Sequence, residues 1–346
     1  MITTASNTPS ASTYNQSMHR FAIFLTLWTF FVVVIGGTVK SHEAGLSIPE
    51  PFIFHWIKDW YNRPNLKWEF FHRMIVGILY IGMAAFMILT LLYDKRSVVR
   101  RFSVYIFIAV NIQALIGYLT VRLFAHPPTS IPHAALGQSI LAMMAGMTTV
   151  MSEKWLSDAS AHVETEAPSL RQLARWNLIA VFVQLLLGAA LRHDDRGRAL
   201  LDGREWVFYT HLGAHVLGAV AVSYFLARVL FRVFRDYRQQ PEIIKPAKYI
   251  MMLLGVQLVL GASAAILKIY FALDPLNAEL YADMPPPARV WTATAHVAVG
   301  ALILLFSTVL TLRSYRFATP SPLILNTGST GDLNRSSHAK FAEVPA

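Results

Sequence analysis

Four histidines stand at the start of four hydrophobic segments, the second, fourth, sixth and eighth along the chain: His72, His133, His215 and His296. An ionisable side chain inside a membrane span is costly and marks a functional site by default. Neutral imidazole is also the commonest metal ligand among side chains. Four histidines at matching depth therefore predict paired axial ligands for a buried metal or haem.

The composition indicates what must position these histidines. The chain has 346 residues, of which 55% are hydrophobic and only 14% charged, so it is too apolar for an ordinary soluble domain. It contains no cysteine, which excludes disulfides, thiolate ligands and iron–sulfur clusters held by this chain. The net charge of +10 comes largely from short loops between apolar runs, so we expect it to set membrane topology and expect no nucleic-acid partner.

The apolar runs predict an all-α polytopic membrane protein. A helix needs about 20 apolar residues to cross a bilayer. Eight such spans are predicted, at Phe21–Val39, Phe70–Tyr93, Val104–Leu123, Ser130–Met151, Trp176–Leu191, Trp206–Val233, Tyr249–Phe271 and Val290–Leu312.

Basic residues in the loops predict the orientation of these spans. They follow the second, sixth and eighth spans, at Lys95, Arg96, Arg100, Arg101, Arg235, Arg238, Lys245, Lys248, Arg313 and Arg316. All of these loops lie on one side, which the positive-inside rule makes cytoplasmic. We therefore expect a multi-pass protein of the cytoplasmic (inner) membrane with both termini in the cytoplasm.

A repeated pair of residues divides the chain into two halves. Gln113 and Gly117, Gln184 and Gly188, and Gln257 and Gly261 each lie four residues apart in odd-numbered spans, on one helix face. Their simplest role is interhelical packing. The repeat predicts eight transmembrane helices in two pseudo-symmetric four-helix bundles, related by an axis along the membrane normal.

The expected division of the chain follows from this repeat. The two bundles occupy residues 19–152 and 176–316. A cytoplasmic linker, residues 153–175, joins them. Residues 1–18 and 317–346 are polar and are predicted to be disordered cytoplasmic termini.

The histidines form one pair in each bundle, His72 with His133 and His215 with His296, all in the outer leaflet. Bis-imidazole ligation of a haem between the helices of a bundle is consistent with this arrangement. Zinc is an alternative, because His211 and His215 have the spacing of a zinc-binding helix, but no carboxylate ligand is evident nearby.

The remaining histidines and some small residues have less specific interpretations. We expect His19, His162 and His338 to be solvated, and His42, His55, His126 and His193 to lie in outer loops or at the edges of spans. Small residues beside the ligands would either let a flat macrocycle approach or serve helix packing alone: Ala134, Ala135, Gly137, Ala214, Gly218 and Gly300.

Glu69 distinguishes the two pairs. It lies three residues before His72 and shares its helix face, where a carboxylate could accept a proton or stabilise a developing cation at the edge of a bound haem. The alternative is an interfacial glutamate paired with Arg73 or Lys67. Leu212 takes the equivalent place before His215, so the N-terminal site is predicted to carry the chemistry.

Three stretches of sequence resemble the haem A synthase family. They are Gly36–Ser47, Glu69–Arg73 and Ile131–Gln138, and Gln184–His193 is similar too. The resemblance covers all eight spans. It implies oxidation of the C8 methyl group of haem O to a formyl group, which gives haem A for cytochrome oxidase.

The resemblance also implies roles for individual residues. Glu69, His72 and His133 would form the catalytic half, which receives haem O as substrate, and His215 and His296 would hold a haem b that passes electrons on. Arg73 would contact the haem. The expected partners are a haem O synthase, a membrane electron acceptor such as a quinone, the lipid bilayer and a second copy of the chain.

The chain departs from the family pattern in lacking the cysteine pair that many bacterial members have in an outer loop. Two other functions remain open: a di-haem b-type electron carrier without haem-modifying activity, and a haem transporter or chaperone. Glu69 discriminates between the enzyme and the pure carrier, because a pure carrier should tolerate Glu69→Gln.

Overall fold

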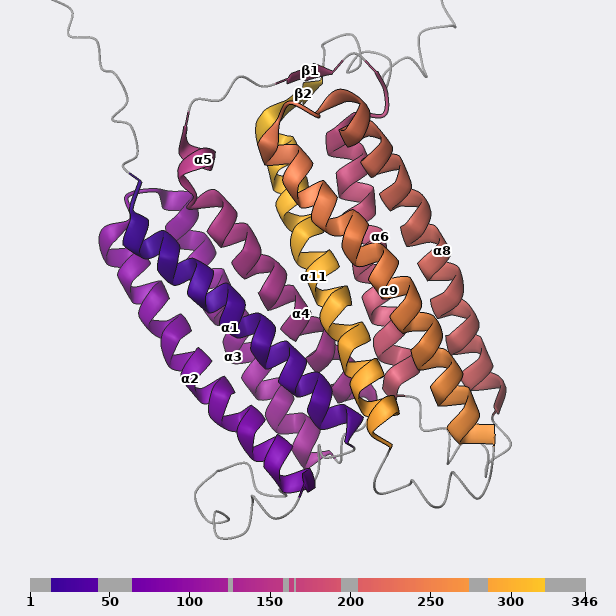
Figure 1. Cartoon of the computed structure of the whole chain (residues 1–346). Helices are drawn as coiled ribbons and strands as arrows, with labels where there is room; N and C mark the ends of the chain where they lie inside the picture. Colours follow the sequence, from indigo (N-terminus) through magenta and orange to yellow (C-terminus); the bar gives the residue numbers. More distant parts are fainter. Residues whose placement is uncertain are drawn as a thin grey trace, which may run out of the picture.

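A computed structural model shows an assembly of long helices (Figure 1). It describes residues 14–42, 64–123, 127–157, 162–164, 166–193, 205–273 and 286–320. The long helices are α1 (Gln16–Ser41), α2 (Pro64–Tyr93), α3 (Ser97–Arg122), α4 (Pro127–Val150), α6 (Leu170–His193), α8 (Glu205–Asp236), α9 (Pro241–Leu273) and α11 (Pro287–Phe317). Helices suit these apolar runs, because a helix satisfies its own backbone hydrogen bonds in lipid.

Seven of these helices are long and apolar enough to cross a membrane, so the chain is a polytopic membrane protein. Within the described residues the exception among the long helices is α4, which carries Pro132, Gln138 and several hydroxyl side chains. It packs against α1, α3, α6 and α11 and has ten buried residues. A helix enclosed by other helices does not need the apolar outer face that lipid requires, and this accounts for its lower hydropathy.

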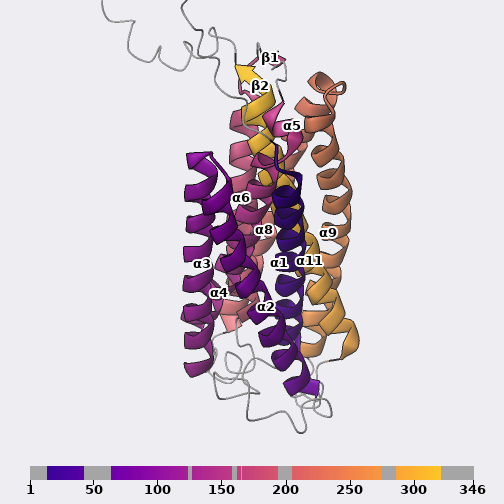
Figure 2. The ribbon, with the colours of Figure 1, turned by 90° about the vertical axis from the view of Figure 1, so that its left-hand side faces the viewer.

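The helices pack in two groups with the same internal order. In the first group α1 contacts α2, α2 contacts α3, α3 contacts α4, and α4 returns to α1. In the second group α6, α8, α9 and α11 make the same circuit. The groups meet where α1 packs on α11, α4 on α6, and α4 on α11. Figure 1 shows the two groups side by side with their helices roughly aligned, and in Figure 2 the first group stands in front of the second.

Each group encloses its own apolar core. Leu25, Phe86 and Met144 lie in the core of the first group, and Val181, Leu226 and Leu304 lie in that of the second. The outer surface is apolar as well, with Ile81 and Leu217 about 70% exposed. Large aliphatic side chains exposed along transmembrane helices match a lipid environment rather than water.

The helices are longer than the predicted spans. The fifth predicted span, Trp176–Leu191, lies within α6, which begins six residues earlier at Leu170, and α9 begins eight residues before the predicted Tyr249. Hydropathy detects the part of a helix that lies within the bilayer, whereas the helix continues into the polar interface while its backbone hydrogen bonds still form.

A strand pair and a short helix lie at one end of the molecule (Figure 2). After α5 (Glu153–Leu156), β1 (His162–Glu164) pairs in parallel with β2 (Ala318–Pro320), and Val163 lies opposite Thr319. This pairing was not predicted. It orders part of the expected linker and the first described residues of the segment expected to be a disordered tail. The prediction for residues 1–13 and 321–346 lies outside the described residues.

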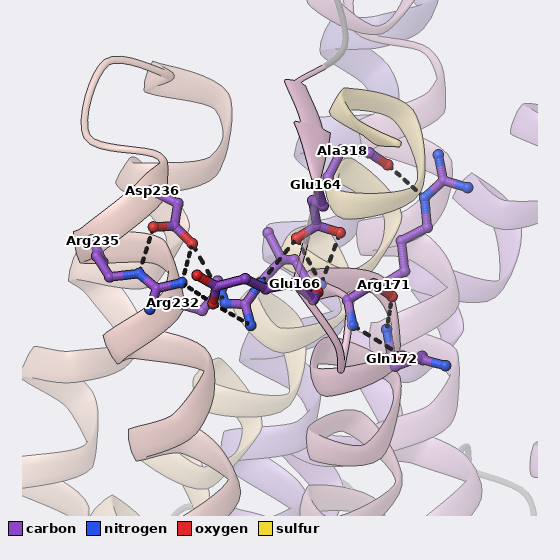
Figure 3. Close-up of polar contacts among 10 residues, drawn as sticks. Glu164, Glu166, Arg171, Gln172, Arg232, Arg235, Asp236 and Ala318 are labelled. Atoms are coloured by element: carbon purple, nitrogen blue, oxygen red, sulfur yellow. Dashed lines mark hydrogen bonds and ion pairs between the residues drawn. The ribbon is translucent and has the colours of Figure 1, made fainter. Parts of the chain in front are cut away.

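Ion pairs fasten these strands to the second group of helices (Figure 3). The buried Glu164 carboxylate accepts the backbone N–H of Leu170 at 2.9 Å, at the start of α6, and lies 3.9 Å from the Arg232 guanidinium. Arg235 pairs with Glu166 at 2.5 Å. Arg171 donates to the carbonyl of Ala318 at 2.5 Å. The linker and the end of α11 are therefore held on α6 and α8.

Candidate functional site

Each of the four predicted histidines packs against a glycine of the preceding long helix. A Cβ atom added at Gly117, Gly188 or Gly261 would come within 2.8–2.9 Å of Cε1 of His133, His215 or His296, respectively. At Gly36 it would come 3.1 Å from Cε1 of His72. Contacts below 3.0 Å essentially never occur at real Cβ atoms, so glycine lets each imidazole lie directly on its neighbour's backbone.

Glutamines one turn before three of these glycines fix the same helix pairs. The Gln113 amide donates to the carbonyl of His133 at 3.0 Å, and the Gln184 amide donates to that of His215 at 2.9 Å. The Gln257 amide lies 3.4 Å from Nε2 of His296. The predicted packing role of the glutamines and glycines is confirmed, and the glycines also accommodate the histidines.

The second pair of histidines faces one another. The ring centres of His215 and His296 lie 6.2 Å apart with an interplanar angle of 78°. With a metal–nitrogen bond of about 2 Å on each side, two imidazoles that ligate one ion have centres about 6 Å apart. Nδ1 of His296 is buried without a hydrogen-bond partner in the described part of the chain. These two residues therefore fit a bis-imidazole haem iron.

The first pair has similar features. His72 and His133 lie close enough to interact electrostatically, on α2 and α4. Among the described residues, Nδ1 of each ring is buried and has no hydrogen-bond partner. Buried polar atoms are normally satisfied, so two orphaned ring nitrogens in one region indicate a site for an electrophile such as a metal ion. This half therefore offers the same type of donor, a pair of imidazoles, as the second half.

Glu69 is buried in α2, one turn before His72, with only 3% of its surface exposed. Its carboxylate forms a short ion pair with the guanidinium of Arg73, one turn further along the same helix. The simple alternative for Glu69, a pair with Arg73, is thus present in the structure. The Glu69 side chain is nevertheless buried one turn before His72 on the same helix, where a carboxylate could accept a proton. Arg73 accordingly positions Glu69.

The first helix pair lacks the glutamine contact of the other three. Val32 lies one turn before Gly36 on α1, at the position where α3, α6 and α9 carry glutamine. These glutamines also contact glycines of α4, α8 and α11. A Cβ atom added at Gly137 or Gly300 would lie 3.2 Å from the amide nitrogen of Gln113 or Gln257, respectively, and Gln184 lies against Gly218. Val76 stands four residues after His72, in the place of Gly137 and Gly300. The α1–α2 contact is therefore the divergent copy.

The glycines beside the histidines are packing positions. Because Gly137, Gly218 and Gly300 each face a glutamine side chain, these three do not form an open surface for a flat macrocycle. The zinc alternative gains no support, because within the described residues no three histidine, aspartate or glutamate side chains group around a common point.

Arg192 connects the two groups near their histidines, and sequence reasoning missed it. It lies one turn after Gly188 on α6, and its guanidinium donates to the carbonyl of Gly37 at 2.6 Å and to Oγ of Ser41 at 2.7 Å. Gly37 follows the glycine on which His72 lies. Its spacing of four residues from Gly188 indicates only that it shares that helix face, and does not indicate its partners on α1.

His42 lies at the edge of a span, as expected, but it and His19 have neighbours that the sequence did not predict. His42 stacks on Trp68, with ring centres 5.3 Å apart, and lies edge-on to Trp291, so it belongs to an aromatic cluster that joins α1, α2 and α11. His19 is half-buried and bonds the hydroxyl of Tyr14 at 2.9 Å, which corrects the solvated interpretation. His55, His126 and His338 lie outside the described residues.

Comparison with known proteins gives one family. The family of cytochrome oxidase assembly proteins, COX15-CtaA, matches residues 62–276, well over half of the chain. The matched segment includes Glu69 and three of the four histidines, and it ends before His296. No curated protein matches the chain.

Proposed function

The chain belongs to the COX15-CtaA family of cytochrome oxidase assembly proteins, and from this premise we propose that it is a haem A synthase. It would oxidise the C8 methyl group of haem O to a formyl group, an oxidation that requires an electron acceptor. The observation that carries the proposal is the histidine-on-glycine contact, repeated in both halves, while among the described residues a buried carboxylate lies one turn before only one of these histidines.

We further infer that all eight long helices cross the membrane as two copies of a four-helix unit. The matching circuits of helix contacts and the separate cores support this arrangement. The basic residues favour an inner-membrane protein with both termini in the cytoplasm. The histidines then lie near the outer surface.

In this proposal the N-terminal half holds the substrate. His72 and His133 would bind haem O, Arg73 would fix the Glu69 carboxylate, and Glu69 would accept a proton or stabilise positive charge at the reacting methyl group. His215 and His296 would hold haem b, which when bound supplies one-electron redox chemistry. A haem O synthase and a membrane electron acceptor, such as a quinone, are the expected partners, and a second copy of the chain is a further one.

The decisive experiment supplies haem O to cells that lack their own haem A synthase and express this chain. Acid-extracted haem is then analysed for haem A. Wild type should yield haem A, Glu69→Gln should yield none while still carrying haem b, and the control Glu153→Gln should resemble wild type. Normal haem A from Glu69→Gln would refute the catalytic role of Glu69.

The same preparation separates the proposed function from a pure electron carrier. His215→Ala or His296→Ala should lower the haem b content of the purified protein, whereas His72→Ala should abolish haem A and leave haem b in place. If wild type carries haem b and passes electrons but never yields haem A, the chain is a di-haem carrier and the enzymatic proposal fails.

A further inference from the structure

A cavity of about 330 Å³ lies between α1, α4, α9 and α11, where the two groups of helices meet. It is at the other end of these helices from the histidines: Val309, which lines it, follows His296 by thirteen residues of α11, or about 20 Å of helix. A ligand in this cavity would not reach the four histidines, so it would be a different ligand from a haem held by them.

Basic residues contribute to a lining that is otherwise mostly apolar. Lys245, Arg313 and His19 lie in the wall of the cavity, together with Thr148 and Ser152. Arg313 pairs with Glu242, with 3.4 Å between guanidinium and carboxylate, and also donates to the Glu242 carbonyl at 2.9 Å.

Glu242 does not balance all of this charge. In the part of the chain that the structure describes, Lys245 has no ion pair. Arg313 is thus paired while Lys245 adds a positive charge that no described carboxylate pairs with, and this excess charge favours an anionic ligand.

One wall of the cavity is apolar. Leu305, Phe306 and Val309 line it on α11, and Ala145 lines it on α4. Tyr249 stacks on Phe306, with ring centres 5.0 Å apart, and is about half exposed. Tyrosine at this depth is typical of the boundary between lipid headgroups and acyl chains. The ligand should therefore carry an anionic head and an apolar tail.

We propose that this cavity binds the phosphate headgroup of an anionic phospholipid, with the start of an acyl chain along the apolar wall. Lys245 and Arg313 contact the phosphate, and the lipid bridges the two groups of helices. Basic pockets between transmembrane helices on the cytoplasmic side are suited to such headgroups. This proposal does not depend on haem A synthase activity.

The test uses the full chain purified in a neutral detergent. Its thermal unfolding is followed as phosphatidylglycerol is added, with phosphatidylcholine, inorganic phosphate and a short-chain quinone in parallel. We expect phosphatidylglycerol to raise the unfolding temperature saturably, and the other three additions to have little effect. A basic residue near anionic lipid contributes about 1 kcal/mol. Lys245→Gln should therefore weaken the apparent affinity about fivefold.

Lys248→Gln is the matched control, because Lys248 is exposed one turn away on α9 and does not line the cavity. It should bind like wild type. Arg313→Gln should weaken the apparent affinity for phosphatidylglycerol as well. If Arg313→Gln does not fold, the result for Lys245→Gln decides the test. Equal stabilisation by phosphatidylcholine or phosphate, a stronger effect of the quinone, or unchanged binding in Lys245→Gln would overturn the proposal.

Discussion

At the level of single residues, the glycines under the four histidines are the most sensitive positions of the candidate site. In Gly261→Ala the new methyl group would lie 2.9 Å from Cε1 of His296, so the ring or its helix must move. We expect this variant to lose most of its haem b, because bis-imidazole ligation requires both rings in place. The measurement is the haem-to-protein ratio of the purified protein and its absorption spectrum.

Gly255→Ala provides the control for this change. Gly255 lies on the same helix, α9, and a Cβ atom there meets nothing within 4 Å among the described residues. Alanine is the better helix former, so this variant should keep its haem and unfold no more easily than wild type. Equal haem content in the two variants would contradict the proposed contact between His296 and Gly261.

Much of the candidate site could be predicted from residue types and spacing. The histidines are the ionisable groups that recur at one depth of the even spans, and the glutamine–glycine spacing places them in a repeat. The sequence did not predict that the rings lie on Gly117, Gly188 and Gly261, because spacing along one helix says nothing about which residue of the next helix it meets. Arg192 was missed for the same reason.

At the level of helices, Arg192 ties the two groups together. Its guanidinium donates to the carbonyl of Gly37 and to Ser41 across the contact between α6 and α1. Arg192→Gln would remove charge-assisted hydrogen bonds, which contribute about 1.5–3 kcal/mol each when buried and less here because Arg192 is half-buried. We expect a lower unfolding temperature and slower haem A formation, with haem b still bound.

Arg175→Gln is the control for Arg192, since Arg175 lies on the same helix, is exposed, and contacts only the Trp176 ring in the described structure. It should leave both properties near wild type. If Arg192→Gln unfolds and acts like Arg175→Gln, the two groups do not depend on this contact.

The existence of the helices follows from hydropathy, but their arrangement does not. The apolar runs predict all eight long helices. Hydropathy gives a weak signal for α4, because a helix that faces other helices on several sides needs fewer apolar residues. The strand pair could not be predicted either, since three residues on each side carry no periodic pattern.

At the level of the whole molecule, the pairing of β1 with β2 is expected to stabilise the second group of helices. A chain that ends after Phe317 would lose β2 and the Ala318 carbonyl that Arg171 contacts. We expect it to unfold at a lower temperature than wild type. A chain that ends after Pro320 retains both and should match wild type. Equal unfolding temperatures for the two truncations would show that the strand pair contributes no stability.

The strand pair also has a consequence for synthesis of the chain. β1 precedes α6, whereas β2 follows α11, so every helix of the second group leaves the ribosome between them. The first group can complete its core early, as N-terminal units of a growing chain generally do. The residues of β1, including Glu164, can pair with β2 only after α11 has been synthesised. Folding of the second group is thus completed by a closing contact that forms only after α11 and β2 have been synthesised.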